Sequence, residues 1–154
     1  MDTLSLRIIL VDDDAADREL IHWALASAIQ PIQIDEMTTG QELIDWLAHQ
    51  RSLNAQHVPP DNSFVTIILL DIHMPAMTGL ETVRLLGDMR NLPYIPVVVL
   101  AATMNEQLKQ QAYEQGIHLY MVKPTRSGGV HRVVEAVKLC YRDTLRLREQ
   151  SEIL

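Results

Sequence analysis

Residues 64–71 read Phe-Val-Thr-Ile-Ile-Leu-Leu-Asp, a nearly unbroken run of β-branched and aliphatic side chains that stops at an aspartate. Such a run is typical of a central strand that other elements cover on both faces. Two more apolar runs, 7–11 and 95–101, predict strands of the same kind, and the stretches 32–37 and 117–122 predict another two. The chain is therefore expected to contain five strands, with 64–71 inside the sheet.

Helical patterns fill the stretches between these strands. Thr39 with Glu42, and Thr103 with Glu106, have the spacing of capping boxes, in which two side chains bond the free main-chain N–H groups at the start of a helix. Gly116 is expected to end the fourth helix, because glycine readily takes the left-handed conformation of a helix C-terminus. The five predicted helices span residues 15–29, 39–50, 79–89, 103–116 and 127–140.

This alternation of strands and helices predicts an α/β fold, a doubly wound five-stranded parallel sheet flanked by five helices. The length of 154 residues suits a single domain. We expect its core at about 6–142, a helical extension over 143–154, and a surface loop over 51–63, where proline, asparagine and serine replace any apolar period.

The composition excludes several classes of protein. With 13 basic and 20 acidic residues, the formal net charge of -7 has the wrong sign for direct binding to nucleic-acid phosphates. No stretch approaches the roughly 18–20 apolar residues of a membrane span, so we expect a cytoplasmic protein. Cys140, Trp23 and Trp46 lie in helical stretches, where we expect the thiol to be buried and unreactive and both indole rings to pack.

Charged residues follow three of the predicted strands. Asp12 and Asp13 come after the first strand, Asp71 ends the third, and Lys123 follows the fifth. Ligands of doubly wound sheets bind at the carboxyl ends of the strands, so we expect these side chains at one edge. Carboxylates held together repel each other unless a cation neutralises them, and Mg²⁺ prefers such oxygen ligands. One carboxylate would then be free to attack phosphorus, while the lysine stabilises charge on the phosphoryl oxygens.

Three motifs carry a family resemblance. The run from Ile8 to Asp14, the segment Leu69 to Gly79, which includes Asp71-Ile-His-Met-Pro, and the segment Tyr120 to Pro124 follow the ends of the predicted strands in the right order. Together they resemble the CheY-like receiver domain of response regulators in two-component systems, over about residues 6 to 142. The resemblance implies a flavodoxin-like strand order, 2-1-3-4-5.

The resemblance also implies roles for the acidic residues. Asp71 would be the phosphoacceptor and, with Asp12 and Asp13, a ligand of the Mg²⁺ ion. Asp13 would bind Mg²⁺ directly, Asp12 mainly through water, and His73 through its backbone carbonyl. Lys123 would pair first with Asp71 and then with the phosphoryl group. A cis peptide bond before Pro124 would help to aim the lysine, since cis bonds occur almost exclusively before proline.

One position departs from the family pattern. Receivers usually carry Thr or Ser at the end of the fourth strand, where the hydroxyl binds the phosphoryl group, but this position is Ala101 here. We expect Thr103 to cap the fourth helix rather than to replace that hydroxyl. Tyr120 holds the aromatic switch position, or else simply packs at the sheet edge. His73 and Thr103 hold the positions that tune the lifetime of the phosphoryl group in this family.

Three functions are compatible with these residues. The first is a signalling module that takes a phosphoryl group from a histidine kinase or a histidine phosphotransfer protein and contacts a downstream protein through the fourth helix, fifth strand and fifth helix. It would catalyse only its own phosphorylation and dephosphorylation. The second, motivated by Ala101, is an interaction module that works without phosphorylation. The third is an aspartate-nucleophile phosphohydrolase, which is disfavoured because such enzymes need an aspartate where His73 stands.

The last predicted helix raises the question of a homodimer. Four apolar residues recur among its charges and beyond its expected end: Leu139, Tyr141, Leu145 and Leu147. They form either a dimer seam or part of a frayed tail. The surface of the fourth helix, fifth strand and fifth helix is the other place where two copies would meet.

Overall fold

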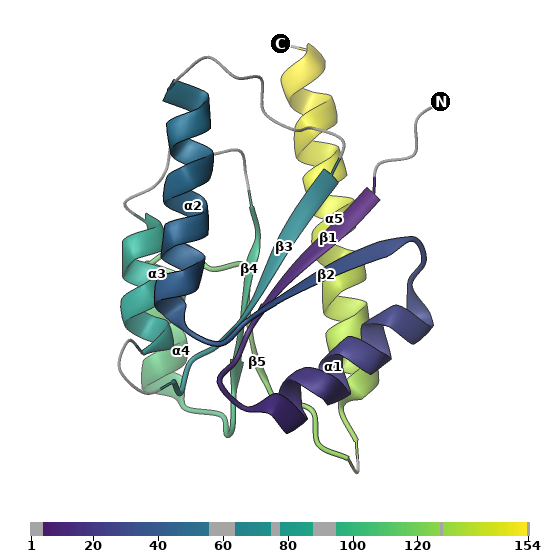
Figure 1. Cartoon of the computed structure of the whole chain (residues 1–154), viewed down its shortest axis with the longest axis vertical. Helices are drawn as coiled ribbons and strands as arrows, with labels where there is room; N and C mark the ends of the chain where they lie inside the picture. Colours follow the sequence, from purple (N-terminus) through teal and green to yellow (C-terminus); the bar gives the residue numbers. More distant parts are fainter. Residues whose placement is uncertain (1–4, 56–63, 75–77, 88–94, 127, 154) are drawn as a thin grey trace.

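The computed structural model describes residues 5–55, 64–74, 78–87, 95–126 and 128–153. Strands and helices alternate along the chain, as predicted (Figure 1). The strands are β1 (Ser5–Val11), β2 (Ile32–Met37), β3 (Phe64–Asp71), β4 (Val97–Ala101) and β5 (Leu119–Val122). The helices are α1 (Ala15–Ala28), α2 (Gly40–Ala55), α3 (Gly79–Gly87), α4 (Glu106–Glu114) and α5 (Val130–Ile153).

The strands form one parallel sheet in the order β2-β1-β3-β4-β5, which confirms the predicted fold class. β3 lies at the centre, between β1 and β4, and every residue from Val65 to Asp71 is buried. In the β3–β4 register Asp71 lies opposite Leu100. In the β4–β5 register Ala101 lies opposite Val122. The last residues of β3, β4 and β5 therefore end near one edge of the sheet.

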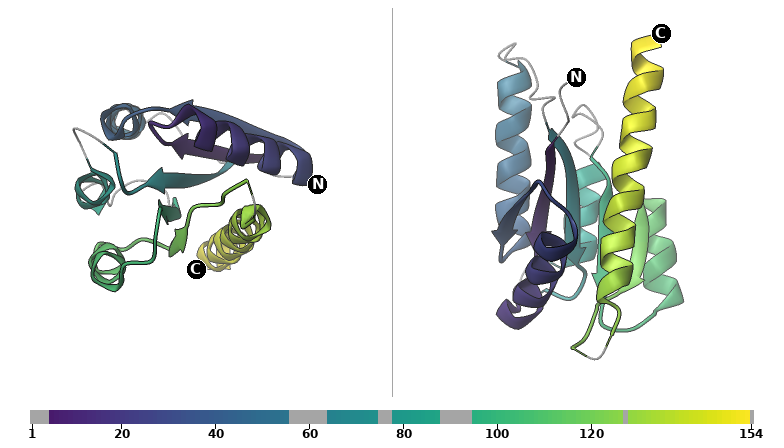
Figure 2. Two further views of the ribbon diagram at one scale, coloured as in Figure 1. Left: turned by 90° about the horizontal axis from the view of Figure 1, so that it is seen from below. Right: turned by 90° about the vertical axis from the view of Figure 1, so that its right-hand side faces the viewer.

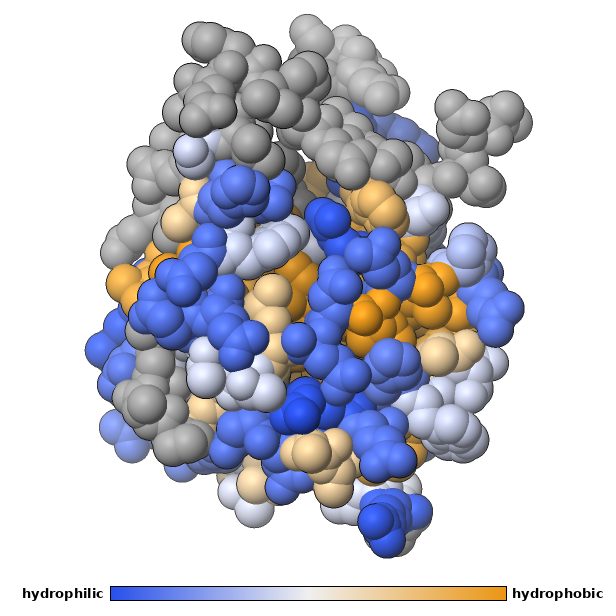
Figure 3. All heavy atoms as spheres, viewed as in Figure 1, coloured by the Kyte–Doolittle hydropathy of each residue, from blue (hydrophilic) through white to orange (hydrophobic). Residues whose placement is uncertain are grey.

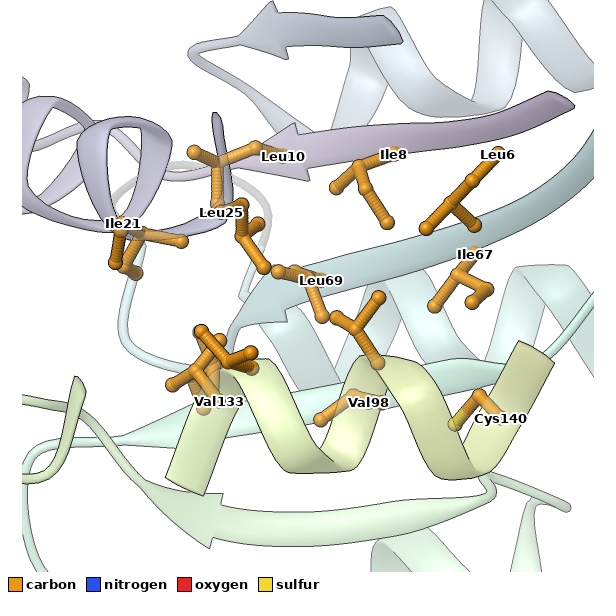
Figure 4. Close-up of a cluster of buried hydrophobic side chains, with 14 of the residues drawn as sticks. Leu6, Ile8, Leu10, Ile21, Leu25, Ile67, Leu69, Val98, Val133 and Cys140 are labelled. Atoms are coloured by element: carbon orange, nitrogen blue, oxygen red, sulfur yellow. The ribbon is translucent and has the colours of Figure 1, made fainter. Parts of the chain in front are cut away.

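Helices cover both faces of the sheet, with α1 and α5 on one face and α2, α3 and α4 on the other (Figure 2). Side chains of a strand alternate between the two faces, so each inner strand serves two cores. In β3, Ile67 and Leu69 face α1 and α5, while Ile68 and Leu70 face the other helices. Figure 4 shows the first of these cores, where side chains of β1 and β3 meet those of α1 and α5. Burial of a core residue of this size stabilises the fold by about 1.5–3 kcal/mol.

Several element boundaries differ from the prediction. α2 continues to Ala55, so the expected surface loop over 51–63 begins with helical residues, and its part 56–63 lies outside the described residues. β1 starts two residues earlier than predicted, β4 and β5 start two residues later, and α5 begins at Val130. The predicted start of α5 near residue 127 and end of α3 at 89 lie outside the described residues.

The start of α4 also corrects a prediction. Asn105, and not Thr103, is the N-cap, and its side-chain oxygen accepts a hydrogen bond from the N–H of Leu108 at 3.1 Å. Thr103 is exposed and stands two residues before the cap. Asparagine caps a helix as well as threonine does, so the prediction chose the wrong one of two suitable residues. The turn after the helix is as predicted, with Gly116 at φ 92°.

α5 extends beyond the end of the sheet (Figure 2). Its residues beyond 142 still contact the core and β3. Thr144 is buried, and its hydroxyl donates to the carbonyl of Cys140 at 2.8 Å. Tyr141 and Leu145 pack against the core below α1 and α5. The guanidinium of Arg148 donates to the carbonyl of Phe64 at the start of β3, at 2.8 Å. The helix beyond residue 142 is thus part of the fold at least to Arg148, and is not a frayed tail there.

The described part of the surface shown in Figure 3 is mainly hydrophilic, with several apolar patches. On the face shown in Figure 3, hydrophilic residues separate the apolar patches. Trp23 is 65% exposed, which contradicts the expectation that it packs, whereas Trp46 packs against the core beneath α2, α3 and α4. Leu139 and Leu147 of α5 are also exposed. Among the described residues, no helix is both long and apolar enough to cross a membrane.

Candidate functional site

The loop after β1 places two aspartates in different surroundings. Asp12 is buried, and its Oδ1 accepts a hydrogen bond from the N–H of Asp14 at 2.9 Å, whereas Asp13 is exposed. Asp14 caps α1 by accepting a hydrogen bond from the N–H of Asp17. The guanidinium of Arg18 donates to the carbonyl of Asp12 at 2.7 Å. A side chain from the first turn of α1 therefore fixes the backbone of the loop.

Asp71 ends β3 and is 2% exposed. Its Oδ1 accepts a hydrogen bond from the N–H of His73 at 3.0 Å, while the imidazole of His73 is exposed. The residue that follows, Ile72, is fixed from two sides, because its N–H donates to Leu100 and its carbonyl accepts from the N–H of Gly79. The Asp71 carboxylate is therefore held by one main-chain N–H, and the backbone that follows it is fixed by β4 and α3.

Gly79 allows this close approach of α3 to the end of β3. A Cβ atom at this position would lie 2.3 Å from Cα of Ile72 and 2.5 Å from the carbonyl oxygen of Asp71. Both distances are far shorter than van der Waals contact, so any larger residue would push the backbone apart. The glycine thus helps to define where Asp71 stands.

Lys123 follows β5 and brings a positive charge to the acidic residues. Its main-chain N–H donates to the carbonyl of Ala101 at 2.7 Å, which extends the β4–β5 pairing by one residue. Its Nζ lies 2.7 Å from Asp12 Oδ2, 2.8 Å from Asp17 Oδ2 and 3.2 Å from Asp71 Oδ2. One ammonium group thus contacts three carboxylates.

At both Asp12 and Lys123, burial and the neighbouring charges shift the pKa in opposite directions. Burial raises the pKa of Asp12 to about 6, and the contact with Lys123 and the N–H of Asp14 offset only part of that effect. Burial by itself would lower the pKa of Lys123, but its contacts with Asp12 and Asp17 outweigh it and raise that pKa above its ordinary value. The lysine is therefore charged at neutral pH, and the carboxylates outnumber it.

The donor set suits a divalent metal ion. Asp12, Asp13 and Asp71 each offer a carboxylate oxygen, and these oxygens all lie within 4.8 Å of one another. Asp12 Oδ2 is buried and has no aligned hydrogen-bond donor among the described residues, although Lys123 is close by. Hard cations such as Mg²⁺ and Mn²⁺ prefer ligands of this kind. These residues are therefore suited to bind a divalent cation.

The expected switch residues lie on β4 and β5, the last two strands before Lys123. Ala101 is fully buried at the end of β4 and offers no hydroxyl. Tyr120 is 6% exposed, and its hydroxyl is buried without an aligned hydrogen bond in the described part of the chain. Burial raises the pKa of Tyr120, and the neighbouring N–H of Asn105 offsets part of this. The N–H of Tyr120 donates to the hydroxyl of Tyr113 in α4 at 3.1 Å. The ring of Tyr120 is therefore packed against the core from the edge strand β5.

The structure brings together most of the residues expected at this edge of the sheet. They are three carboxylates that lie within 4.8 Å of one another, those of Asp12, Asp13 and Asp71, and the ammonium group of Lys123, which contacts Asp12 and Asp71. The cis bond expected before Pro124 is not found, since the cis peptide bond of the described residues joins Gln30 and Pro31. A trans bond is the preferred isomer before proline, and Lys123 reaches the carboxylates without the cis form.

Asp17 is a site residue that the sequence patterns did not indicate. This aspartate stands four residues after Asp13, on the first turn of α1, and its Oδ2 accepts a hydrogen bond from Lys123 Nζ. The approach of Asp17 to Lys123 depends on the rotation of α1 relative to the sheet, so no spacing in the sequence indicated it.

Comparisons with known proteins agree with this geometry. The sequence pattern of the response regulator receiver domain matches residues 8–135. Response regulator Rcp1 of Synechocystis sp. is 28% identical over 143 residues, which cover 91% of this chain and 91% of Rcp1. The crystal structure of its Mn²⁺-bound form has a TM-score of 0.64 at 27% identity and covers 85% of this chain and 88% of that one.

Two further comparisons add a phosphorylated structure and a longer protein. The phosphorylated cyanobacterial phytochrome response regulator RcpA has a TM-score of 0.63 at 30% identity, covering 86% of this chain and 88% of that one. The cyclic di-GMP phosphodiesterase response regulator RpfG of Xanthomonas campestris pv. campestris is 26% identical over 149 residues, and the chain spans 34% of its length. The activity in the name of RpfG therefore belongs to a protein of which this chain matches about a third. The chain itself belongs to the response regulator receiver domain family.

Proposed function

We propose that this receiver accepts a phosphoryl group on Asp71 in a Mg²⁺-dependent reaction. The observation that carries the proposal is the convergence on Asp71: its Oδ2 lies 3.2 Å from Lys123 Nζ, and its carboxylate lies within 4.8 Å of oxygens from Asp12 and Asp13. The donor is a phosphohistidine of a sensor histidine kinase or a histidine phosphotransfer protein. A carboxylate so placed is a nucleophile with positive charge beside it, as phosphoryl transfer requires.

The reaction breaks one bond and forms another. A carboxylate oxygen of Asp71 attacks phosphorus, the P–N bond of the phosphohistidine breaks, and its electron pair stays on the imidazole nitrogen, which takes up a proton. Lys123 binds a phosphoryl oxygen. Mg²⁺ would be held by Asp71, by Asp13 directly, by Asp12 mainly through water and by the carbonyl oxygen of His73, and it would supply positive charge next to the phosphoryl oxygens.

The modified receiver signals by protein contact in this proposal. The site lies at the ends of β1, β3 and β5, and Tyr120 of β5 connects it to α4 through the hydrogen bond to Tyr113. The surface of α4, β5 and α5 binds the downstream protein or a second copy of the chain. The exposed residues Val122 and Leu139 offer apolar contacts there. The chain acts as a single domain with its core at about 6–142.

Phosphorylation is tested with the purified protein and a small phosphodonor such as acetyl phosphate. Intact mass should increase by one phosphoryl group in the presence of Mg²⁺ and not in EDTA. Asp71→Asn should abolish the increase. Asp45→Asn, which removes an exposed carboxylate from α2, should leave it unchanged. An unmodified wild type, or equal labelling of the Asp71→Asn variant, would contradict the proposal.

A second function follows from Ala101. This residue is fully buried where the family usually carries a hydroxyl, and the hydroxyl of Tyr120 is already buried without an aligned partner. With no hydroxyl at position 101 to bind the phosphoryl group, phosphorylation would have little effect on Tyr120. The chain would then work as an interaction module whose partner binds the unmodified form equally well. Comparing the affinity of a partner for the modified and unmodified protein separates the two functions.

A further inference from the structure

The contacts of Lys123 are not equivalent. Its hydrogen bond to Asp17 Oδ2 has a length of 2.8 Å, whereas Asp12 Oδ2, although 2.7 Å from Nζ, has no aligned donor among the described residues. The contact with Asp71 is the longest, at 3.2 Å. The ammonium group therefore contacts Asp12 and Asp17 at nearly equal distances and is farthest from the residue that we propose as phosphoacceptor.

Two features favour the contact between Lys123 and Asp17. The side chain of Asp17 is on the first turn of α1, where the helix dipole favours a carboxylate. The N–H of Asp17 donates to the capping Asp14 at 3.0 Å, which fixes the backbone from which the carboxylate extends. The Asp17 side chain is 36% exposed, compared with 1% for Asp12 and 3% for Asp71, so it regains water more easily than the other two when the lysine leaves.

We infer that Asp17 is a positioning residue that holds Lys123 at α1 and competes with the phosphoryl group for it. The inference rests on the proposed function and adds a negative regulator to the same site. An ammonium group has three N–H donors, and three carboxylates already surround this one. A phosphoryl oxygen must replace one of them, and the partly exposed Asp17 is the contact that is most easily given up.

The negative charge of Asp17 opposes binding of a phosphoryl group, as its contact with Lys123 does. The cluster holds the carboxylates of Asp12, Asp13, Asp17 and Asp71 and one ammonium group. Asp17 makes the site more negative, which attracts a divalent cation but repels an incoming phosphoryl group. Removal of this carboxylate should therefore strengthen binding of a phosphoryl analogue and slightly weaken binding of Mg²⁺.

The test compares beryllofluoride affinity at saturating Mg²⁺ for four proteins: wild type, Asp17→Asn, Asp17→Glu and Glu19→Gln. Glu19→Gln is the matched control, because it removes an exposed carboxylate from the same helix, about 200° away around its axis. Beryllofluoride binding is followed by ¹⁹F NMR, and Mg²⁺ binding by calorimetry. Asp17→Asn should bind beryllofluoride about three- to tenfold more tightly than wild type, the size expected for a partly exposed charge contact. Asp17→Glu retains the charge and should stay near wild type, as should Glu19→Gln.

A stability readout checks the contact without any ligand. A double-mutant cycle of Asp17→Asn with Lys123→Met, measured by urea unfolding without Mg²⁺, should show that the two substitutions are coupled. Additive effects would overturn the inference. Equal or weaker beryllofluoride binding by Asp17→Asn would also overturn it, since weaker binding would mean that Asp17 aids the phosphoryl site. Failure of the proposed function looks different, because then wild type itself would bind no beryllofluoride, and the inference would fall with it.

Discussion

Lys123 lies closer to Asp12 than to Asp71, with Nζ at 2.7 Å from the former carboxylate and 3.2 Å from the latter. Both carboxylates are almost fully buried. A buried carboxylate without a counter-charge is costly, because little water is left to solvate it. The lysine is therefore a stabilising residue of the fold as well as a member of the candidate site.

Lys123→Met should lower the free energy of unfolding at pH 7 by about 2–4 kcal/mol, because two buried carboxylates lose their partner. Added Mg²⁺ should restore part of this loss. Urea unfolding with and without the metal measures both effects. Lys138→Met is the control, since Lys138 is 48% exposed and only 3.8 Å from Glu135, and it should stay within about 0.5 kcal/mol of wild type. Equal effects of the two substitutions would refute the structural role of Lys123.

Two glycines of α3 should respond oppositely to alanine. Gly79→Ala places Cβ against the backbone of Ile72 and Asp71, and should destabilise the fold by about 2–3 kcal/mol or more and weaken Mg²⁺ binding. At Gly87 the nearest atom would be 3.7 Å away. Gly87→Ala should therefore be neutral or stabilise by up to about 1 kcal/mol, because alanine favours the helix. Thermal unfolding and metal titration of both variants check the contrast, which a harmless Gly79→Ala would disprove.

Ala101→Thr introduces the hydroxyl that most receivers carry. We expect a larger beryllofluoride-induced change at Tyr120, read from its NMR chemical shifts. The added atoms enter a fully buried position and should cost about 1–3 kcal/mol of stability. Ala101→Val has nearly the same shape without the hydroxyl and should show the cost but not the larger response. If both variants respond like wild type, Ala101 does not limit the switch.

The pH dependence of stability should contain a contribution from Cys140. Burial raises its pKa from 9.0 to about 12 in the folded protein, and Asp143 adds to the shift. The unfolded state therefore loses the thiol proton first, and ionisation favours unfolding as the pH rises above about 9. The free energy of unfolding should fall more steeply between pH 9 and pH 12 in wild type than in Cys140→Ala. Parallel curves would show that the thiol contributes nothing.

Shortening α5 should reveal where its structural part ends. A chain that stops after Asp143 loses the buried Thr144, the packing of Leu145 and the hydrogen bond from Arg148 to Phe64. We expect a loss of about 2–4 kcal/mol in unfolding free energy. A chain that stops after Glu149 retains these contacts and should match wild type within about 0.5 kcal/mol. Denaturation of the two shortened proteins distinguishes these cases, and equal stability would mean that the tail is dispensable.

The sequence predicted the fold and the proximity of four site residues, because both follow from the apolar pattern of the individual strands. Apolar runs located the strands, and the rule that parallel strands end at one edge placed Asp12, Asp13, Asp71 and Lys123 together. This inference needed no side-chain detail. Strand order in turn required only the family resemblance.

Other features depend on competition between similar residues and were not predictable. Thr103 and Asn105 are both good caps two residues apart, and only the packed helix decides between them. Asp17 required knowledge of the helix phase relative to the sheet. Trp23 has the expected place in a helix but points outward, because the apolar side of α1 is already formed by Ile21, Ala24 and Leu25.

The strand order has a consequence for how the site is completed during synthesis. Asp12, Asp17 and Asp71 precede Lys123 in the chain, and β5 pairs only with β4 at the edge of the sheet. A growing chain that has reached β3 carries the acidic residues without their lysine. Without a bound metal ion, the counter-charge of Lys123 reaches these carboxylates only once β5 has paired with β4.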